Sequence, residues 1–507
     1  MIPSAGGPFR FVNLISDPIH GYIELTKRQS GPEAEAAGLP PESAAEEDIL
    51  DTAWLQRLRR ISQLQSARWV FPTAEHSRFT HGLGVMHEAG LWARHLYPSL
   101  RATLAAERPG ATPPSNRPGA THATLPPVPS EGLVVETMRI AGLLHDVGHG
   151  PFAHFFDDHV LQAFPAPADA RRPAGKALTH EDLSQLIIER ELGDLIRELR
   201  RAPGSVPERD AFAPEESIDP RWVSFLVSKP ALDDSTMPLW VRALQPLLSG
   251  VFTVDNLDYV RRDAYMTGVA VGPVDVERLR RYSFVGPRGL TLYEPGVGAL
   301  EMFLTARLFM YRQVYFHRTV RAIDLDLAEV FGPSIRAIAG DGSPAKELSA
   351  YADLDEYALL HQAAMWARGE SLSADPRPGD GTVTAEIADV WRGILLRRPR
   401  WRSEAEIRVD FEADRWPTDE VEALGRPEAG TVEIDLAVVD ARPGTERALA
   451  AGGDGLAAGG EGRPTGPASL LAIEGRDGRP SSLAAALSRL PAYALVGRRY
   501  RRILADS

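Results

Sequence analysis

The sequence predicts a mainly α-helical protein with a small α+β region at its C-terminus. Apolar residues recur at helical spacing in several segments between residues 51 and 315. Beyond about residue 395, short alternating segments indicate strands. A chain of 507 residues exceeds one ordinary domain and can bury a large core. We therefore expect a large helical core over residues 1–395 and a smaller α+β region over 396–507.

Composition excludes several classes of protein. The net charge of -13 disfavours nonspecific nucleic-acid binding by the whole surface, although a local basic cleft stays open. Because the chain has no cysteine, disulfides, thiolate metal sites and cysteine nucleophiles are excluded. Neither a signal peptide nor an apolar run long enough to span a bilayer is evident, so we expect a cytoplasmic protein without a membrane partner.

The N-terminal part is predicted to begin with a turn and a short alternating strand within residues 11–25, where residues 17–25 carry the pattern. Residues 26–49 are polar and contain proline and glutamate, so we expect a surface insertion. An apolar stripe then predicts a helix beginning at Asp51, formed by Leu55, Leu58, Ile61 and Leu64. By pattern alone, the polar residues on its other faces are solvated: Gln56, Arg59 and Gln63.

A second helix is predicted from residue 76 to about residue 97. Arg78 and His81 are three apart, so a cation and an imidazole can point the same way, and His81 is a candidate metal ligand. His87 and His95 lie further along this helix and are interpreted as packing or surface residues. The following residues, 106–131, are rich in proline, glycine, alanine and threonine, which indicates a flexible loop between helices.

The densest set of candidate ligands lies in residues 140–157. The apolar spacing of residues 140–147 predicts a buried helix that carries His145 and Asp146 at its C-terminal end. Two glycines and a proline then stop it, and a second helix is predicted to start near Phe152. On that helix His154 and Asp157 are three apart and share a face.

Neutral imidazoles and ionised carboxylates in this pattern suit a divalent ion such as iron, manganese, cobalt or zinc. Adjacent residues cannot close such a site, so further ligands must come from elsewhere. One alternative is a set of hydrogen-bonded core histidines with a helix C-cap. Another is a zinc-protease helix, because His145 and His149 are four apart. That motif requires glutamate after the first histidine and an unbroken helix, and Asp146 and Gly148 argue against it.

A helix is also predicted to begin after Thr179, a plausible N-cap, with Asp182 as its capping-box partner, although the box prefers glutamate or glutamine. The helix dipole would favour the neutral form of His180, which suits a ligand or a base. The alternative is a surface histidine.

Two further helix faces carry candidate residues at a spacing of four. Asp255, Tyr259 and Asp263 place two carboxylates and a phenol on one face, and Asp255 is the fourth candidate metal ligand. The same spacing recurs at Arg307, Tyr311 and Tyr315. The arginine could hold a phosphate, and the two aromatic rings could pack against a base or sugar. Taken alone, each stripe is more often core or salt-bridged surface.

The C-terminal region is predicted to contain strands at residues 407–411, 431–439 and 470–473. A Gly- and Ala-rich stretch near 450–469 indicates a flexible linker. Residues 482–504 are predicted to form a closing helical segment whose arginines make a solvated basic face. The basic stretch 397–402 could contact nucleic acid, but a solvated or interface role is favoured.

The ordered set of His81, the His145-Asp146 pair and Asp255 resembles the H…HD…D motif of the HD-domain superfamily of metal-dependent phosphohydrolases. Further segments between residues 51 and 263 resemble its deoxynucleoside triphosphate (dNTP) triphosphohydrolase branch. The likeness covers roughly residues 11–325. It implies an HD-domain helical core that hydrolyses dNTPs to deoxynucleoside and inorganic triphosphate. Two alternative functions are compatible with the same motif. One is a broader HD phosphohydrolase that acts on other nucleotides or phosphate monoesters, and the other is a catalytically silent regulator that binds nucleotide or nucleic acid.

The resemblance also implies roles for individual residues. The matches to the metal ligands are His81, His145, Asp146 and Asp255. Those to the catalytic cluster are His149, His154, Asp157 and His180. Those to substrate-binding positions are Gln63, Leu64, Arg78, Tyr259, Asp263, Arg307, Tyr311 and Tyr315. Those to an activator site for GTP or a dNTP are Asp51, Gln56 and Arg59.

The metal implied is Fe, Mn, Co, Zn or Ni, with room for a second ion, Mg²⁺, on the nucleotide phosphates. The resemblance further implies a homo-oligomer, either a dimer or a tetramer. Asn256 stands where the best-known member has a phosphate-binding lysine, and Tyr311 stands where it has histidine. The insertions at 26–49 and 106–131 are not part of the family pattern.

Overall fold

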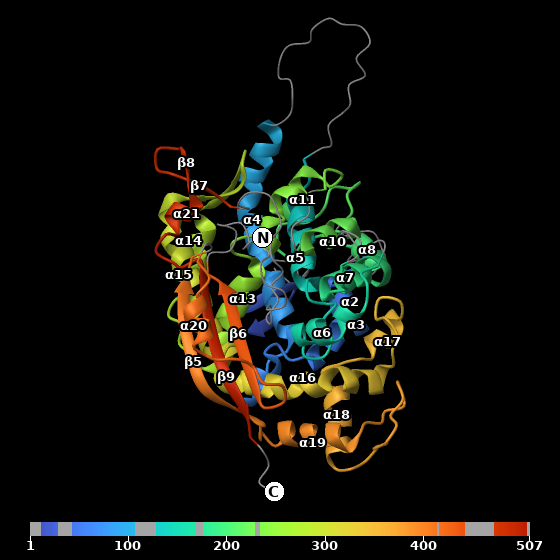
Figure 1. Ribbon diagram of the computed structural model, residues 1–507. Coiled ribbons are helices and arrows are strands. Elements are labelled where there is room, and N and C mark those ends of the chain that lie inside the picture. The colour runs from blue at the N-terminus through green and yellow to red at the C-terminus, as the bar shows by residue number, and fades with distance from the viewer. Residues whose placement is uncertain are drawn as a thin grey trace, which may run out of the picture.

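The computed structural model describes residues 12–28, 43–106, 128–167, 176–228, 234–412, 415–441 and 471–503. Helices dominate these residues, as the sequence predicts, and strands are few and mostly in the C-terminal part (Figure 1). The predicted linker at 450–469 and most of the predicted insertions at 26–49 and 106–131 lie outside the described residues.

Three helices form the centre of the molecule: α4 (Arg78–Ala106), α5 (Glu131–Leu144) and α13 (Val254–Thr267) (Figure 1). Both α5 and α13 pack against α4. The backbones of α4 and α5 approach closely, because a Cβ at Gly142 would lie 2.9 Å from the carbonyl oxygen of Val85. This contact brings the first turn of α4 beside the last turn of α5.

The other described helices surround this centre. Those that follow the candidate ligand segment are α6 (His154–His159), α7 (His180–Leu186) and α10 (Pro220–Val227). The others are α2 (Glu46–Leu50), α3 (Ala53–Arg57), α8 (Gly193–Glu198), α9 (Pro207–Asp210), α11 (Leu239–Leu244), α12 (Pro246–Ser249), α14 (Val276–Arg281), α15 (Val297–Met310), α16 (Arg318–Ala339), α17 (Leu348–Ala352), α18 (Glu356–Ala367), α19 (Ala385–Leu395), α20 (Thr418–Glu422) and α21 (Leu483–Ala486).

The described strands form three sheets. The strands β1 (Val12–Asp17) and β2 (Gly21–Thr26) make an antiparallel hairpin. A four-stranded sheet has the order β3 (Ser283–Gly286), β4 (Gly289–Tyr293), β7 (Ala472–Glu474) and β8 (Pro480–Ser481). A three-stranded antiparallel sheet has β9 (Tyr493–Arg502) between β5 (Trp401–Phe411) and β6 (Val432–Asp440). Because β7 pairs with β4, the C-terminal residues share a sheet with the preceding region.

The prediction of a helix at the C-terminus is wrong, because residues 493–502 form β9 (Figure 1). As a central strand, β9 is covered on both faces, so its sequence lacks the alternation that marks a half-exposed strand. The basic face is not fully solvated either. Arg498 is buried, and its guanidinium donates to Glu406 Oε2 at 2.6 Å.

Three N-terminal predictions also need correction. The strand predicted within 17–25 is the second half of a hairpin, since β1 precedes it. The helix predicted from Asp51 is broken into α3, a 3₁₀ turn at Leu58–Arg60 and another at Gln65–Trp69, although its apolar stripe is buried. The end of the polar segment is not surface, because Glu46 is fully buried and pairs with Arg139 at 2.6 Å.

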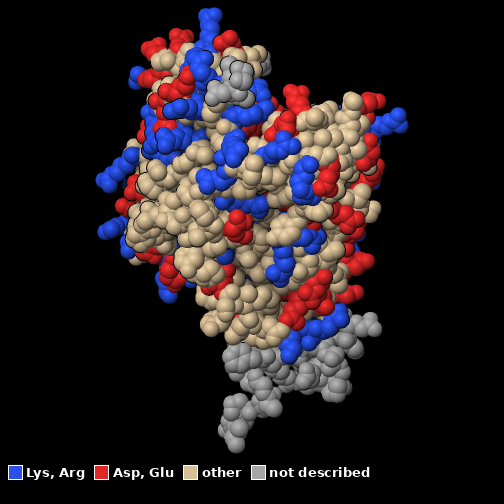
Figure 2. Space-filling model, turned by 90° about the horizontal axis from the view of Figure 1, so that it is seen from below, with Lys and Arg blue, Asp and Glu red and all other residues tan. Residues whose placement is uncertain are grey.

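Among the described residues, no helix is both long and apolar enough to cross a membrane. The face seen from below intermingles acidic and basic side chains rather than presenting one sign of charge (Figure 2).

Candidate metal centre and neighbouring imidazole cluster

Three helix ends deliver the predicted metal ligands to one place. His81 lies in the first turn of α4, and His145 is the residue that caps the C-terminus of α5, with Asp146 next to it. Asp255 lies in the first turn of α13, where Thr253 caps the helix by accepting from the backbone N–H of Asn256 at 3.0 Å.

These four residues, which we call the ion cluster, converge: His81, His145, Asp146 and Asp255. The first three offer ligand atoms within 4.8 Å of one another. Asp255 Oδ1 lies 3.2 Å from His81 Nε2 and 3.7 Å from His145 Nε2. Atoms that each lie about 2.0–2.2 Å from a shared ion are spaced in this way.

The donor atoms of the ion cluster fit a divalent cation. His145 Nδ1 lies 2.8 Å from the carbonyl oxygen of Gly142, which can only accept, so this nitrogen carries a proton, and a metal would bind through a lone pair on Nε2. That Nε2 is buried and has no hydrogen-bond partner among the described residues. His81 is oriented in the same way, with Nδ1 2.8 Å from Asp258 Oδ2.

The carboxylates make this site strongly electronegative. Burial disfavours a charged His81 ring, but hydrogen bonds to Asp255 and Asp258 outweigh burial and raise its pKa to about 9. A cation would compete with that proton for the same position. Burial also acts to raise the pKa of Asp146, yet His145 and Arg78 hold it well below its usual range, so Asp146 stays ionised.

A second group of residues lies directly beside the ion cluster, and we call it the imidazole cluster: His149, His154, Asp157 and His180. Their nitrogen and oxygen atoms also lie within 4.8 Å of one another. The rings of His149 and His180 stack with centroids 3.7 Å apart, and His149 Nε2 lies 3.4 Å from Asp146 Oδ1. His149 therefore connects the two clusters.

Local backbone features place the imidazole cluster. The predicted capping box at α7 is present, with the Thr179 N–H donating to Asp182 Oδ2 at 3.0 Å, and it presents His180 at the first helical position. A Cβ at Gly148 would lie 2.2 Å from the carbonyl oxygen of His180, so the glycine allows α7 to approach. The non-glycine residues Phe152 and Ala153 have φ of 58° and 47°, a strained turn directly before His154.

The prediction that His180 is neutral is wrong. Burial favours the neutral ring, but Asp157 and Glu181 outweigh burial and raise the pKa of His180 to about 9. The helix dipole is the weaker influence here because the Asp157 carboxylate lies 2.5 Å from His180 Nδ1. His149 differs, since burial and the nearby Arg78 hold its pKa well below its usual range.

Sequence comparison agrees with this arrangement. Residues 78–211 match the HD domain, and residues 274–370 match the HD associated region. The chain therefore carries an HD domain that is followed by an HD associated region. The HD domain thus contains His81, His145, Asp146 and the imidazole cluster, whereas Asp255 lies beyond the matched segment.

Two curated relatives illustrate the similarity. The chain is 28% identical over 366 residues to deoxynucleoside triphosphate triphosphohydrolase SAMHD1 of Homo sapiens, covering 69% of this chain and 49% of that protein. It is 27% identical over 319 residues to the uncharacterized protein YwfO of Bacillus subtilis, covering 62% of this chain and 54% of that protein. The chain therefore spans about half the length of these relatives.

Two solved structures share the fold. A hypothetical protein from Aquifex aeolicus has a TM-score of 0.62 at 20% identity, covering 97% of this chain and 96% of that chain. A phosphohydrolase from Bacteroides thetaiotaomicron has a TM-score of 0.56 at 20% identity, covering 97% of this chain and 100% of that chain. At this identity the likeness shows the fold alone.

The predicted substrate-binding residues fall into separate groups, and Arg78 is the one in contact with the ion cluster. Arg78 is buried and pairs with Asp146 of the ion cluster. On α13, Tyr259 accepts a hydrogen bond from Arg307 Nε at 3.1 Å. Arg307 also donates to the backbone oxygen of Asp440 at 2.8 Å, so the end of β6 holds this arginine.

The aromatic residues pack into one wall. The Tyr315 hydroxyl donates to Asp263 Oδ2 at 2.6 Å, and its ring lies 5.0 Å from that of Tyr311 and 6.3 Å from that of Tyr259. The Arg307 guanidinium lies 4.9 Å from the centre of the Tyr311 ring. The two stripes predicted on separate helices therefore meet.

Gln63 and Leu64 are both buried between the 3₁₀ turns that follow α3. The Gln63 side-chain oxygen has no hydrogen-bond partner among the described residues, so it is an available acceptor.

The three predicted activator residues lie together at the surface. Arg59 donates to Gln56 Oε1 at 2.9 Å and stacks on Phe79, with its guanidinium 3.7 Å from the ring centre. Gln56 in turn donates to the backbone oxygen of Leu50 at 2.8 Å, and Asp51 is exposed next to it.

Two supporting residues escaped the sequence analysis as functional candidates, namely His20 and Asp258. Asp258 accepts from the ligand His81, and His20 bonds to Asp258 at 2.6 Å. The sequence does contain a signal for Asp258, because it is a second carboxylate three residues after Asp255. On a helix that spacing places both carboxylates on one face, where both can contact His81. Nothing local indicated that residue 20 would reach it.

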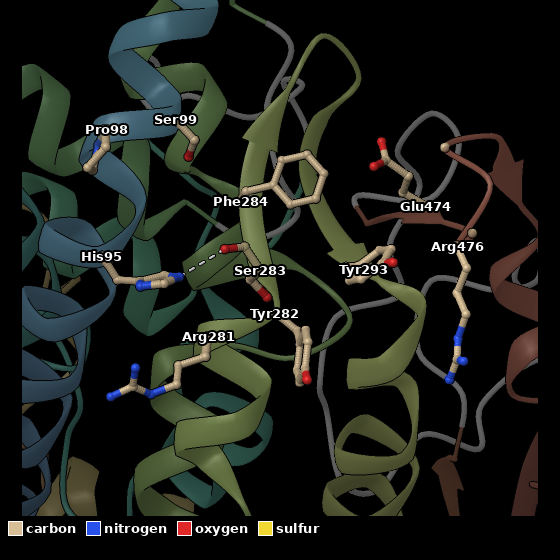
Figure 3. A pocket seen from close by; sticks show the side chains of 12 residues that line it. His95, Pro98, Ser99, Arg281, Tyr282, Ser283, Phe284, Tyr293, Glu474 and Arg476 are labelled. Atoms are coloured by element: carbon tan, nitrogen blue, oxygen red, sulfur yellow. Dashed lines mark hydrogen bonds between the residues drawn. The ribbon is translucent and has the colours of Figure 1, made fainter.

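A separate pocket of about 520 Å³ lies further along α4, beside β3 and the turn after β7 (Figure 3). His95 lines it and bonds through Nε2 to the backbone oxygen of Ser283 at 3.0 Å. Fourteen residues of helix separate His95 from His81, which is about 21 Å along the axis. This pocket is therefore not part of the HD-domain site.

Proposed function

We propose that this protein is a metal-dependent triphosphohydrolase that cleaves a dNTP into a deoxynucleoside and inorganic triphosphate. The observation that carries the proposal is the contact of 3.4 Å between His149 and Asp146, which places the imidazole cluster directly against the ion cluster. A group able to donate a proton then lies beside the site for a cation. A metal-dependent hydrolysis of a phosphate ester can use both.

The ion cluster would hold Fe, Mn, Co, Zn or Ni through two imidazole nitrogens and two carboxylates. A bound divalent ion would supply a water nucleophile at neutral pH and polarise a phosphate oxygen. A second ion, Mg²⁺, could enter with the nucleotide phosphates as part of the substrate.

The residues of the imidazole cluster would handle protons. His154 is the member that is most open to solvent, and its Nδ1 lies 3.6 Å from Asp157 Oδ2. We infer that His154 protonates the departing 5′-oxygen, while Asp157 orients its ring. His149 and His180 pack against it and fix its place, with ring centroids 4.7 and 5.2 Å away.

Positive side chains would stabilise the triphosphate. Arg78 lies against Asp146 and can reach a phosphate bound at the ion cluster. Arg307 lies between two tyrosines at the aromatic wall and can bind a phosphate further from the reacting atom. Both arginines are buried, which strengthens their interaction with an anion.

A deoxynucleoside is the leaving group that the surroundings support best. The unpartnered Gln63 oxygen could accept from a sugar 3′-hydroxyl beside Leu64. Tyr315, fixed by its bond to Asp263, would crowd a 2′-hydroxyl and so disfavour ribonucleotides. The similarity to a relative named as a deoxynucleoside triphosphate triphosphohydrolase points to the same substrate class.

Regulation belongs to the same proposal. GTP or a dNTP would act as the activator at Asp51, Gln56 and Arg59, which gather at one surface. Such a surface site would join copies of the chain, so we propose a homo-oligomer, either a dimer or a tetramer. A role in nucleic-acid binding is not favoured, because Arg400 in the basic stretch is paired with Asp326 at 2.8 Å.

The test is product analysis. Metal-stripped protein is reconstituted with each candidate metal and incubated with the four dNTPs, singly and mixed, and the products are separated by chromatography. Deoxynucleoside plus intact triphosphate supports the proposal. Monophosphate plus pyrophosphate, or equal turnover of ribonucleotides and monophosphates, indicates a broader phosphohydrolase. A metal-loaded protein that is inert toward all nucleotides indicates a regulator.

A further inference from the structure

The tip of the N-terminal hairpin reaches into the core of the molecule. His20, in the turn between β1 and β2, has a side chain that is only 2% exposed. The turn is fixed by Asp17, whose Oδ1 accepts from the backbone N–H groups of Ile19 at 2.9 Å and His20 at 3.0 Å. The hairpin thereby presents one imidazole to the interior at a defined position.

That imidazole bonds to a carboxylate on a different element. His20 Nε2 lies 2.6 Å from Asp258 Oδ1, and Asp258 is a fully buried residue of α13. Since an ionised carboxylate only accepts, the ring donates from Nε2. Its other nitrogen, Nδ1, lies 3.6 Å from Glu88 Oε1, outside hydrogen-bond distance.

The second oxygen of the same carboxylate orients a ligand of the ion cluster. Asp258 Oδ2 lies 2.8 Å from His81 Nδ1, so the opposite nitrogen of His81 faces Asp255. Arg262 donates to both oxygens of Asp258, at 2.8 and 2.9 Å. Asp258 is thus held by a cation on one side and by His20 on another.

The packing around this carboxylate requires a close helix approach. A Cβ at Gly84, one turn after His81 on α4, would lie 2.0 Å from Asp258 Oδ1 and 2.4 Å from Arg262 Nη2. The glycine therefore allows the Asp258 and Arg262 side chains to lie against the helix that carries the ligand. Each member of the chain from hairpin to ligand has little freedom to move.

We propose that His20 is a positioning residue for the metal site, and that it acts on His81 through Asp258. This inference rests on the ion cluster of the proposed function. Without the His20 donor, Asp258 Oδ1 would keep only its bond from Arg262, so the carboxylate would be held less firmly and the bond that fixes the His81 ring would weaken. A metal ligand held less firmly binds its ion less tightly. The hairpin thus contributes to metal affinity although it carries no ligand.

A purely structural role for His20 makes a different prediction. The hairpin has a second anchor, because Asp17 Oδ2 pairs with Arg262 Nη1 at 2.8 Å. Loss of the imidazole should therefore leave the hairpin in place. If His20 only holds the hairpin, its removal should lower thermal stability without changing the affinity for metal.

The experiment measures Mn²⁺ affinity in the full chain by following the signal of free Mn²⁺ in electron paramagnetic resonance. For His20→Ala we expect affinity to fall about 10- to 100-fold, the usual effect of losing a group that supports a ligand. His20→Gln should recover much of the affinity, since its amide can donate to Asp258. The matched control is His87→Ala, whose ring packs 5.0 Å from His20 but forms no bond to Asp258, and it should stay within about 3-fold of wild type.

A double-mutant cycle tests the route. Asp258→Asn should itself weaken Mn²⁺ binding, and adding His20→Ala to it should change affinity by less than about 3-fold if both act on the same step. The thermal midpoint of each metal-free variant checks folding. Affinity of His20→Ala within about 3-fold of wild type, or a full additional loss in the Asp258→Asn background, would overturn the inference.

These outcomes are separate from the proposed reaction. A wild-type protein that binds Mn²⁺ but releases no triphosphate contradicts the proposed function and leaves the effect of His20 on affinity to stand. A wild-type protein that hydrolyses dNTPs while His20→Ala binds Mn²⁺ normally contradicts only the inference. A wild-type protein that binds no Mn²⁺ contradicts the inference as stated.

Discussion

The ion cluster and the imidazole cluster use the same residue types and touch each other, yet their surroundings give them different chemistry. In the ion cluster, the Nε2 atoms of His81 and His145 face carboxylates. The Nδ1 atom of His145 bonds to a backbone oxygen, which leaves its Nε2 without a hydrogen-bond partner among the described residues. In the imidazole cluster, the rings pack on one another and Asp157 approaches two of them. In the proposed function, the two clusters differ in role because of the groups that bond to their histidines and aspartates. One cluster would hold a cation, and the other would donate a proton.

The largest expected effect comes from removing a ligand of the ion cluster. His145→Ala should lose bound metal and lower dNTP hydrolysis by at least about 10³-fold, because the ion supplies several kcal/mol of stabilisation. Metal content and rate are measured on the same sample. His95→Ala is the matched control, since this histidine lies far along α4 and bonds to the backbone oxygen of Ser283 in β3, and both quantities should stay near wild type. Full metal content in His145→Ala would contradict the assignment.

Removing the proton donor should separate the two clusters. His154→Ala should lower kcat by about 10²- to 10⁴-fold while metal content stays unchanged, because His154 belongs to the imidazole cluster only. His159→Ala, an exposed histidine on the same short helix, should have neither effect. Loss of metal in His154→Ala would mean that the two clusters act as one metal site.

The pH dependence of stability should also report the imidazole cluster. The pKa of His180 is raised from about 6.5 to about 9, chiefly by Asp157 acting against burial. Its stabilising contribution is therefore fully present below about pH 6.5 and is lost as pH rises through about 9. Denaturant unfolding of the metal-free protein should show wild type losing on the order of 3 kcal/mol more than His180→Gln between pH 6.5 and 9. Parallel curves for the two proteins would contradict the ion pair.

The smallest effect should come from a residue outside both clusters. Arg307→Gln should raise KM for a dNTP about 10-fold with little change in kcat or metal content, because this arginine faces the far part of the triphosphate in the proposed complex. Steady-state kinetics and metal analysis check this together. A fall in kcat of the size expected for His154→Ala would place Arg307 at the reacting atoms instead.

Several features could be predicted from the sequence because they depend on near neighbours. The end of α5 at His145, the capping box of Thr179 and Asp182, and the shared face of Asp255 and Tyr259 all follow from spacing and capping. The strand segments of β5, β6 and β7 also follow from local pattern. The helical core and the family are confirmed for the same reason, since motif and periodicity are local properties.

Only the tertiary structure decided the rest. Residues 493–502 form a strand because β5 and β6 pair with them from both sides, and no local signal records such partners. The pKa of His180 is raised because Asp157 reaches it across the fold. His20 meets Asp258 over a separation of 238 residues. The physical reason is common to all three: periodicity and capping act within one or two turns, whereas pairing, pKa values and the support of ligands depend on side chains that folding brings together.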